Sequence, residues 1–225
     1  MTGPLGVIAF DCGYDRRHLT DVTFWLESGE SLALHGPTGS GKTLLLNTIL
    51  GFAPRWRGNL RIDHQSIRSW PTWRLARHYF GYVPQGRRVW GPLTVAEHLT
   101  IAARSGQPDV AVQEEILDRL PALAARYRTR ANRLSGGEAR MLSLARALIR
   151  SPRVLLLDEP AEGLTAQATA DVAELLARLT TDGSSLIIVD STGRLHHLAA
   201  HHRYLRDGGL HTAAVSFVDD PRSSR

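Results

Sequence analysis

The stretch at residues 36–43 has the residue types that bind the phosphates of a nucleotide. It reads GPTGSGKT, which fits the pattern G-x-x-x-x-G-K-[ST], and it stands between a strand-like and a helix-like segment. Glycines allow the backbone to turn its N–H groups onto phosphate oxygens, while Lys42 supplies a mobile positive charge and Thr43 a hydroxyl group for Mg²⁺. We therefore predict that ATP and Mg²⁺ bind here, with contacts from Gly36, Pro37, Thr38, Gly39, Ser40, Gly41, Lys42 and Thr43.

Two acidic residues follow the apolar run at residues 154–157, which reads VLLL. A carboxylate at the end of a buried strand beside a phosphate-binding loop can hold Mg²⁺ through its water shell, and Asp158 has that place. Glu159 could orient or deprotonate the attacking water. The alternative is that both acids only cap the next helix. The phosphate-binding loop upstream favours the functional interpretation.

A second glycine cluster, LSGGE at residues 134–138, precedes another helix-like segment. Ser135 and the backbone N–H groups of Gly136 and Gly137 could form a further anion site, because a helix N-terminus carries partial positive charge. One nucleotide needs only one phosphate-binding loop. We therefore predict that this second cluster serves the ATP of a partner subunit.

These motifs together resemble the ATP-binding subunits of ABC transporters, and the resemblance covers nearly the whole chain. GPTGSGKT corresponds to Walker A, YVPQG to the Q-loop, LSGGE to the signature and LLLDEP to Walker B, in the order and spacing of the family. The resemblance implies that Gln85 reports to a membrane subunit, and that Ser135 and Gly137 contact the γ-phosphate of the opposite protomer. It also implies that Tyr14 stacks on adenine, with a packing aromatic as the alternative. The implied ligands of Mg²⁺ are Thr43, Gln85 and Asp158.

The stretch YVPQGRRVWGPLTVAEHL is similar to a run in the importer subunits that serve branched-chain amino acids, and in their urea and short-amide relatives. This resemblance implies ATP hydrolysis that energises an importer of branched-chain amino acids, urea or similar small polar solutes. The implied partners are a second ABC ATPase subunit, in a homodimer or heterodimer, membrane permease subunits, and a periplasmic or extracellular solute-binding protein. Two alternatives stay open: a weakly hydrolysing or regulatory subunit of a heterodimer, and a non-transport ABC ATPase that acts on nucleic acid.

Two positions depart from the family pattern. Thr165 stands where the D-loop usually has aspartate, and this branch of importers is variable there. Ser191 stands at the switch position, where most members have histidine and some members of this group have glutamine. Because a hydroxyl group is shorter than an imidazole ring, we expect slow hydrolysis by a homodimer, restored by pairing with a subunit that has an intact switch. The residues to which we assign catalysis are Glu159, Gln85 and Ser191.

Several histidines near the end of the chain could replace the missing switch residue or bind a metal ion. They are His196, His197, His201 and His202. We expect instead a solvated helix with incidental histidines, because no acid or cysteine completes a set of metal ligands. Cys12 is the only cysteine, which excludes an internal disulfide.

Composition and charge restrict the class of protein. The sequence is 43% hydrophobic and 22% charged, as in ordinary globular domains, and it has no run of the roughly 20 apolar residues that a membrane span needs. An acidic residue and a turn come too early in the N-terminus for a signal peptide. We therefore expect a cytoplasmic protein, peripheral on the cytoplasmic face of the plasma (inner) membrane. The net charge is +5, but the basic residues are dispersed without a base-stacking aromatic run, so we expect no nucleic acid partner.

The order of the elements predicts an α/β fold of the P-loop NTPase (ABC ATPase) type, with a parallel core sheet, an N-terminal antiparallel β subdomain and an inserted α-helical subdomain. Strand-like segments lie at 5–10, 22–26, 31–35, 58–63, 80–83, 154–157 and 186–189, and helix-like ones at 44–50, 73–77, 138–150 and 166–180, with a further helical pattern at 94–127. We expect one domain over residues 1–225, in which 1–85 and 151–225 form the nucleotide-binding core and 86–150 the helical signature subdomain. Residues 221–225 read as a frayed tail. The carboxyl ends of parallel strands should bring the phosphate-binding loop and the acid pair to one edge.

Overall fold

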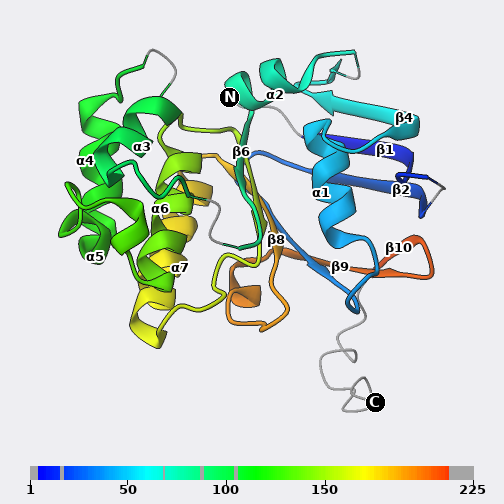
Figure 1. Ribbon diagram of the computed structural model, residues 1–225. Coiled ribbons are helices and arrows are strands. Elements are labelled where there is room, and N and C mark those ends of the chain that lie inside the picture. Colours follow the sequence, from blue (N-terminus) through cyan, green and yellow to red (C-terminus); the bar gives the residue numbers. More distant parts are fainter. Residues whose placement is uncertain (1–4, 16–17, 68, 87–88, 104–105, 213–225) are drawn as a thin grey trace.

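The computed structural model describes residues 5–15, 18–67, 69–86, 89–103 and 106–212. At its centre is a six-stranded sheet with the order β10-β9-β3-β8-β7-β6, in which every neighbouring pair is parallel except β9 and β10 (Figure 1). Every residue of β7 and β8 is buried, because covered parallel strands have apolar side chains on both faces. The strands of this sheet are β3 (Ser31–His35), β6 (Phe80–Val83), β7 (Val154–Asp158), β8 (Ser185–Val189), β9 (His201–Arg206) and β10 (Gly209–Thr212).

A second, antiparallel sheet has the order β2-β1-β4-β5. One of its two inner strands, β1, pairs with β2 on one side and with β4 on the other. Helix α1 packs between the two sheets, because its buried side chains share one hydrophobic core with strands of both. The elements concerned are β1 (Leu5–Cys12), β2 (Leu19–Leu26), β4 (Arg55–Ile62), β5 (Gln65–Ser66) and α1 (Lys42–Leu50).

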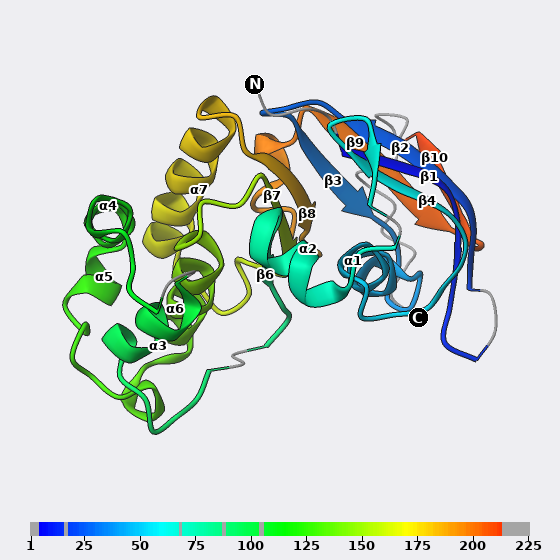
Figure 2. The ribbon, with the colours of Figure 1, turned by 90° about the horizontal axis from the view of Figure 1, so that it is seen from above.

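The helices of the middle third form a separate layer. Figures 1 and 2 show α3, α4 and α5 on the side of the central sheet away from β1, β2 and β4. Capping boxes, formed by Thr94 with Glu97 and by Ser135 with Glu138, begin α3 and α6 and satisfy backbone N–H groups of their first turns. The helices and short 3-10 turns are α2 (Thr72–His78), α3 (Val95–Ala102), α4 (Val110–Arg119), α5 (Pro121–Ala124), η1 (Ala131–Arg133), α6 (Gly136–Leu148), α7 (Ala166–Thr181) and η2 (His196–Leu198). Among the residues described, none of the helices is long and apolar enough to cross a bilayer.

The α/β fold, with its parallel core sheet and its N-terminal antiparallel strands, is confirmed by this arrangement. The expectation of a solvated helix around residues 196–202 was wrong. Only a 3-10 turn, η2, forms there, and His201 and His202 begin β9, which pairs in parallel with β3. The hydrogen bonds of the sheet decide this outcome, because the sequence HHRYLR has no apolar alternation that would predict a strand. The tail predicted at 221–225 lies outside the described residues.

Candidate nucleotide-binding site

The loop at residues 36–43 requires glycine at two positions. Gly36 has a φ of 138°, and a Cβ atom there would lie 2.4 Å from the carbonyl oxygen of Leu205. Gly41 has a φ of 101°, and a Cβ atom there would lie 2.9 Å from the side chain of Leu19. Residues with a side chain rarely adopt such backbone angles, and a Cβ atom at either position would also clash with its neighbours. The tight curvature of the loop therefore depends on these glycines.

The N-terminus of α1 and the side chains around it present donors toward the space inside this loop. Gly41 caps α1 without a side-chain hydrogen bond. Lys42 Nζ donates to the carbonyl oxygens of Gly36 (2.6 Å) and Pro37 (2.9 Å). Ser40 Oγ is buried and has no hydrogen-bond partner among the residues that the structure describes. An uncapped helix start, a cation and an orphaned hydroxyl group fit a bound phosphate chain.

The surroundings of Lys42 shift the pKa of its ammonium group. Burial lowers the pKa of the Lys42 ammonium, while the nearby carboxylates of Glu159 and Asp158 act in the opposite direction. The lysine therefore lies between two acidic groups and the loop, where an anionic ligand would further favour its protonated form.

A hydroxyl group and a carboxylate lie together at the carboxyl edge of the central sheet. Thr43 Oγ1 donates to Asp158 Oδ2 over 2.8 Å, and Asp158 is only 1% exposed at the end of β7. The parallel pairing of β6 with β7 brings Gln85, which follows β6, to the same edge. Oxygen atoms of these types are the ligands that Mg²⁺ prefers. The residues available to a divalent cation are thus Thr43, Gln85 and Asp158.

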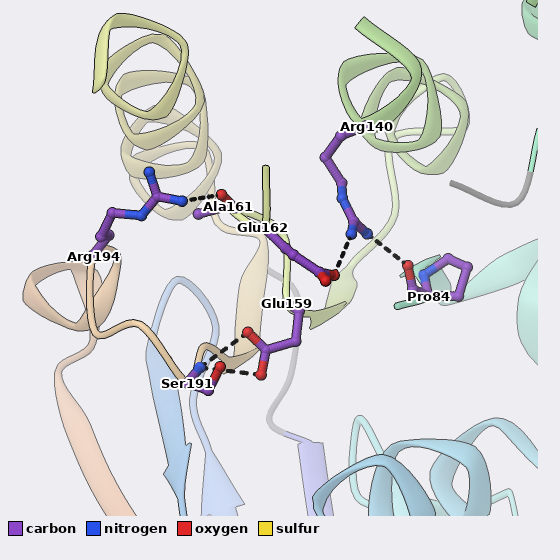
Figure 3. Close-up of polar contacts among 7 residues, drawn as sticks. All are labelled: Pro84, Arg140, Glu159, Ala161, Glu162, Ser191 and Arg194. Carbon is purple, nitrogen blue, oxygen red and sulfur yellow. Dashed lines mark hydrogen bonds and ion pairs between the residues drawn. The ribbon is translucent and has the colours of Figure 1, made fainter. Parts of the chain in front are cut away.

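Glu159 is held in an unusual conformation beside the switch position (Figure 3). Its φ is 55°, in the left-handed region, and its backbone N–H donates to the carbonyl oxygen of Val189 over 2.7 Å. Its carboxylate accepts the backbone N–H of Ser191, with N···O distances of 3.1 and 3.0 Å. Burial raises the pKa of the Glu159 carboxyl, aided by Asp190 and Asp158, whereas the hydrogen bonds from Ser191 lower it. A carboxylate with a raised pKa is a better proton acceptor at neutral pH.

A cavity of about 560 Å³ joins most of the residues selected from the sequence. Tyr14, which is 59% exposed, lies at its wall together with the loop and both acids. Ser135, Gly136 and Gly137 do not line it; they lie at the N-terminus of α6. The lining residues are Tyr14, Asp15, His18, Gly36, Thr38, Gly39, Gly41, Lys42, Thr43, Leu44, Gln85, Asp158, Glu159, Val189 and Ser191.

Sequence reasoning did not select two polar residues that line this cavity, Asp15 and His18. His18 Nε2 donates to the carbonyl oxygen of Gly39 over 3.0 Å, so it supports the loop from the start of β2. Asp15 lies at the cavity wall next to Tyr14. Both belong to the connection between β1 and β2, and only their closeness in sequence to Tyr14 could have indicated them.

Three histidine rings pack together, and one of them belongs to His35, which immediately precedes the loop. His35 Nε2 and His202 Nδ1 share a hydrogen bond of 2.9 Å, and the ring centroids of His35 and His196 are 4.3 Å apart. His196 Nε2 donates to the carbonyl oxygen of Asp190 over 2.7 Å. No group of metal-binding side chains is found in the described part of the chain, so these rings form a packed cluster. Burial, with the charges of His196, His202 and Lys42, lowers the pKa of His35 to about 4.

This depressed pKa predicts a loss of stability in acid. His35 has a pKa of about 4 in the folded chain and about 6.5 when unfolded, so below pH 6.5 the unfolded state binds a proton that the folded state does not. The free energy of unfolding should therefore fall between pH 6.5 and 4, by about 1 to 3 kcal/mol from this group, and no further below pH 4. Urea denaturation of the wild type and of His35→Gln at pH 7, 6, 5 and 4.5 measures the difference. Identical pH dependence of the two proteins would contradict the prediction.

Comparisons with known proteins agree with the fold and the motifs. Residues 19–162 match the model of the ABC transporter family. The chain is 32% identical over 209 residues to the high-affinity branched-chain amino acid transport ATP-binding protein BraG of Pseudomonas aeruginosa, covering 91% of this chain and 90% of that protein. It is 34% identical over 185 residues to the lipopolysaccharide export system ATP-binding protein LptB of Escherichia coli, covering 80% and 76%.

Solved structures agree as well. The ATP-binding subunit of an ABC transporter superposes with a TM-score of 0.81 at 25% identity, covering 92% of this chain and 89% of that one. A dimeric cassette in a post-hydrolysis state, bound to ADP and Pi, gives 0.79 at 24% identity, covering 92% and 96%.

The chain belongs to the ABC transporter family, as an ATP-binding ATPase of that class. Its sequence relatives include branched-chain amino acid transport subunits from a bacterium and from Archaeoglobus fulgidus, together with a lipopolysaccharide export subunit.

Proposed function

We propose that this chain hydrolyses ATP to energise an ABC importer of branched-chain amino acids, urea or similar small polar solutes. The observation that carries the ATPase assignment is one cavity shared by Lys42, by the Thr43–Asp158 pair and by Glu159. The importer assignment is supported by the run YVPQGRRVWGPLTVAEHL and by the similarity to BraG. The chain is also similar to LptB, which is named as a subunit of an export system. The solute and the direction of transport are therefore the parts of the proposal to test first.

In this proposal, each side chain of the cavity has a distinct part in hydrolysis. The N–H groups of the loop and Lys42 bind the phosphates, and Tyr14 stacks on adenine. Thr43, Gln85 and Asp158 hold Mg²⁺, which neutralises charge on the phosphate oxygens when bound. The carboxylate of Glu159, which lines the same cavity, would orient the attacking water and accept its proton.

A second protomer completes the site in this proposal. Ser135, Gly136 and Gly137 form an anion-binding helix start that does not line the cavity of their own chain. A head-to-tail dimer would bring this helix start to the γ-phosphate held by the other chain. A Cβ atom added at Gly137 would lie 3.4 Å from the side chain of Leu164, so the signature lies close to the segment that follows the acid pair in the same chain.

A wide groove provides a docking site for the permease subunits. It has a volume of about 1050 Å³ and is lined by exposed apolar residues, among them Phe52, Trp90 and Ile101, and by two arginines. The ring of Trp90 is stacked on His98, and the guanidinium group of Arg146 lies 4.3 Å from its centroid, so this partly exposed ring is held in place. Exposed apolar patches of this kind are typical of protein interfaces. We propose that a cytoplasmic segment of each permease docks here, on the cytoplasmic face of the membrane.

Ser191 favours a second candidate, a slowly hydrolysing subunit that works in a heterodimer. Ser191, the residue at the switch position, is small and contacts Glu159 only through its backbone N–H and its short side chain. We expect Ser191→His to raise the kcat of the homodimer by about tenfold or more, because an imidazole ring can span to the outer phosphate and hold the water. Phosphate release at saturating ATP measures this effect, and Ser191→Ala should give no increase. Wild-type turnover at ordinary transporter rates, or no gain in Ser191→His, would contradict the prediction.

Copurification tests the transport assignment. The tagged chain is expressed in its own host at native level, membranes are solubilised in mild detergent, and the bound proteins and nucleic acids are identified. The proposal expects integral membrane permeases and a solute-binding protein, with ATPase activity of the complex increased by its solute. Copurified nucleic acid without permeases would contradict it. A companion ATPase with an intact switch histidine would identify the heterodimer.

A further inference from the structure

Residues 161–164, which follow Glu159 and Pro160, are held by two arginines from different elements (Figure 3). Arg140 of α6 donates to Glu162 Oε2 (2.8 Å) and to the carbonyl oxygen of Pro84 (3.0 Å), and it is only 4% exposed. Arg194, in the loop that contains Ser191, donates to carbonyl oxygens of the same segment. Figure 3 shows the two arginines approaching the segment from opposite sides.

Arg194 connects the switch loop, defined here as residues 190–195, to the segment and to α7. Its Nη1 donates to the carbonyl oxygen of Leu164 (3.0 Å) and to Thr169 Oγ1 (3.1 Å), and its Nη2 donates to the carbonyl oxygen of Ala161. A planar guanidinium group presents its N–H donors in fixed directions in one plane, whereas the three donors of an ammonium group rotate on a flexible stem. Arg194 therefore fixes both the distance and the orientation of the switch loop relative to residues 161–164.

Leu195 of the switch loop is buried in the hydrophobic core, and the remaining hydrogen bonds of the loop, apart from that of Ser191 to Glu159, are mainly internal. Asp190 is 3% exposed, and its carboxylate accepts the backbone N–H groups of Thr192 (3.0 Å) and Leu195 (2.8 Å). These bonds define the shape of the loop, but they do not connect it to the segment that follows Glu159. In the part of the chain that the structure describes, the side chain of Arg194 donates hydrogen bonds from the switch loop to residues 161–164.

The position of this loop matters because it orients Glu159. The Glu159 carboxylate accepts the backbone N–H of Ser191 at 3.1 and 3.0 Å, so a shift of the loop moves a donor that both carboxylate oxygens share. Misplacing a reacting group by about 1 Å can cost on the order of 100-fold in rate. Because the donor is a backbone N–H group, the hydrogen bond from Ser191 to Glu159 depends on the position of the switch loop. It is therefore sensitive to the side chains that anchor this loop.

We propose that Arg194 is a positioning residue for ATP hydrolysis: by tying the switch loop to residues 161–164, it holds the Ser191 N–H against the Glu159 carboxylate. This inference rests on the proposed function, in which Glu159 receives the proton of the attacking water. Arg194 touches neither nucleotide nor metal in this scheme and acts only through the loop.

Steady-state kinetics of the purified protein test the proposal. Arg194→Ala should lower kcat by about 10- to 100-fold, with a KM for ATP within about threefold of the wild type, because the nucleotide contacts are untouched. Arg194→Lys should be intermediate, since one ammonium group replaces the fork. Thr169→Val removes a single acceptor of Arg194 and should cause a smaller loss, which keeps the test available if Arg194→Ala does not fold. Arg178→Ala, on the exposed face of α7, is the matched control and should behave as the wild type.

A double-mutant cycle with Glu159→Gln separates positioning from general destabilisation. If Arg194 acts through Glu159, the loss caused by Arg194→Ala should shrink to less than about twofold in the Glu159→Gln background, measured by slow release of labelled phosphate. An equal loss in both backgrounds would overturn the proposal, as would an unchanged kcat in folded Arg194→Ala. A wild-type chain that does not hydrolyse ATP would instead remove the proposed function and this inference with it.

Discussion

The Lys42→Ala variant should bind ATP about 100-fold more weakly than the wild type while keeping its fold. Lys42 is the only lysine in the chain, and its ammonium group lies inside the curve of the loop, 2.6 Å and 2.9 Å from two carbonyl oxygens. Losing a partly buried cation that faces several phosphate charges removes charge-assisted hydrogen bonds, each worth about 1.5 to 3 kcal/mol. Isothermal titration with ATP and Mg²⁺ measures the affinity.

Lys42→Arg is the matched variant, because it keeps the charge and changes only its shape. The planar fork of arginine is larger than an ammonium group and cannot occupy the same confined position. We expect at least about tenfold weaker binding, with the free energy of unfolding within about 1 kcal/mol of the wild type in both variants. Unchanged ATP affinity in Lys42→Ala would refute the assignment of the phosphate-binding loop.

The Glu159→Gln variant should lose hydrolysis but not ATP binding. The amide has nearly the shape of the carboxylate but cannot accept the proton of the attacking water, and general base catalysis typically contributes about 100- to 10,000-fold. We therefore expect kcat to fall by at least about 100-fold while the affinity for ATP stays within about threefold. Because hydrolysis ends the ATP-bound state, the variant should also accumulate as an ATP-bound dimer, which size-exclusion chromatography would detect.

Glu115→Gln is a suitable control, since Glu115 is an exposed carboxylate on α4, with a side chain that is 57% exposed. It should hydrolyse ATP at the wild-type rate. Residual activity of Glu159→Gln above about a tenth of the wild type would show that another group accepts the proton, and Asp158 or a residue of the partner protomer would then be the next to test.

Four strands of the central sheet, β3, β6, β7 and β8, could be predicted from the sequence because their signals are local and apolar. Runs such as VLLLD and SLIIV are buried on both faces and are flanked by turns, so burial and sequence pattern agree. The loop at residues 36–43 could also be predicted, because its glycines, its lysine and its threonine each have a distinct chemical role in phosphate binding.

The parts that could not be predicted depend on contacts between distant residues. β9 begins with His201 and His202, which have no strand signal, and it exists because β3 offers an edge with which to pair. The role that we infer for Arg194 depends on carbonyl oxygens about 30 residues away in the sequence, at Ala161 and Leu164, and backbone acceptors have no sequence signature. The sequence contains many arginines, and composition alone does not indicate which of them contacts these backbone oxygens.

The groove and the nucleotide cavity share part of their walls, because Thr43, Gln85 and Asp158 line both. A ligand in one cavity and a protein segment in the other therefore touch the same three side chains. Thermodynamic linkage then requires reciprocity: if a docked segment changes the ATP affinity by some factor, ATP must change the affinity for that segment by the same factor. If a permease segment docks in the groove, as proposed, the nucleotide and that segment would be coupled through these shared side chains, with no need for a long relay through the fold.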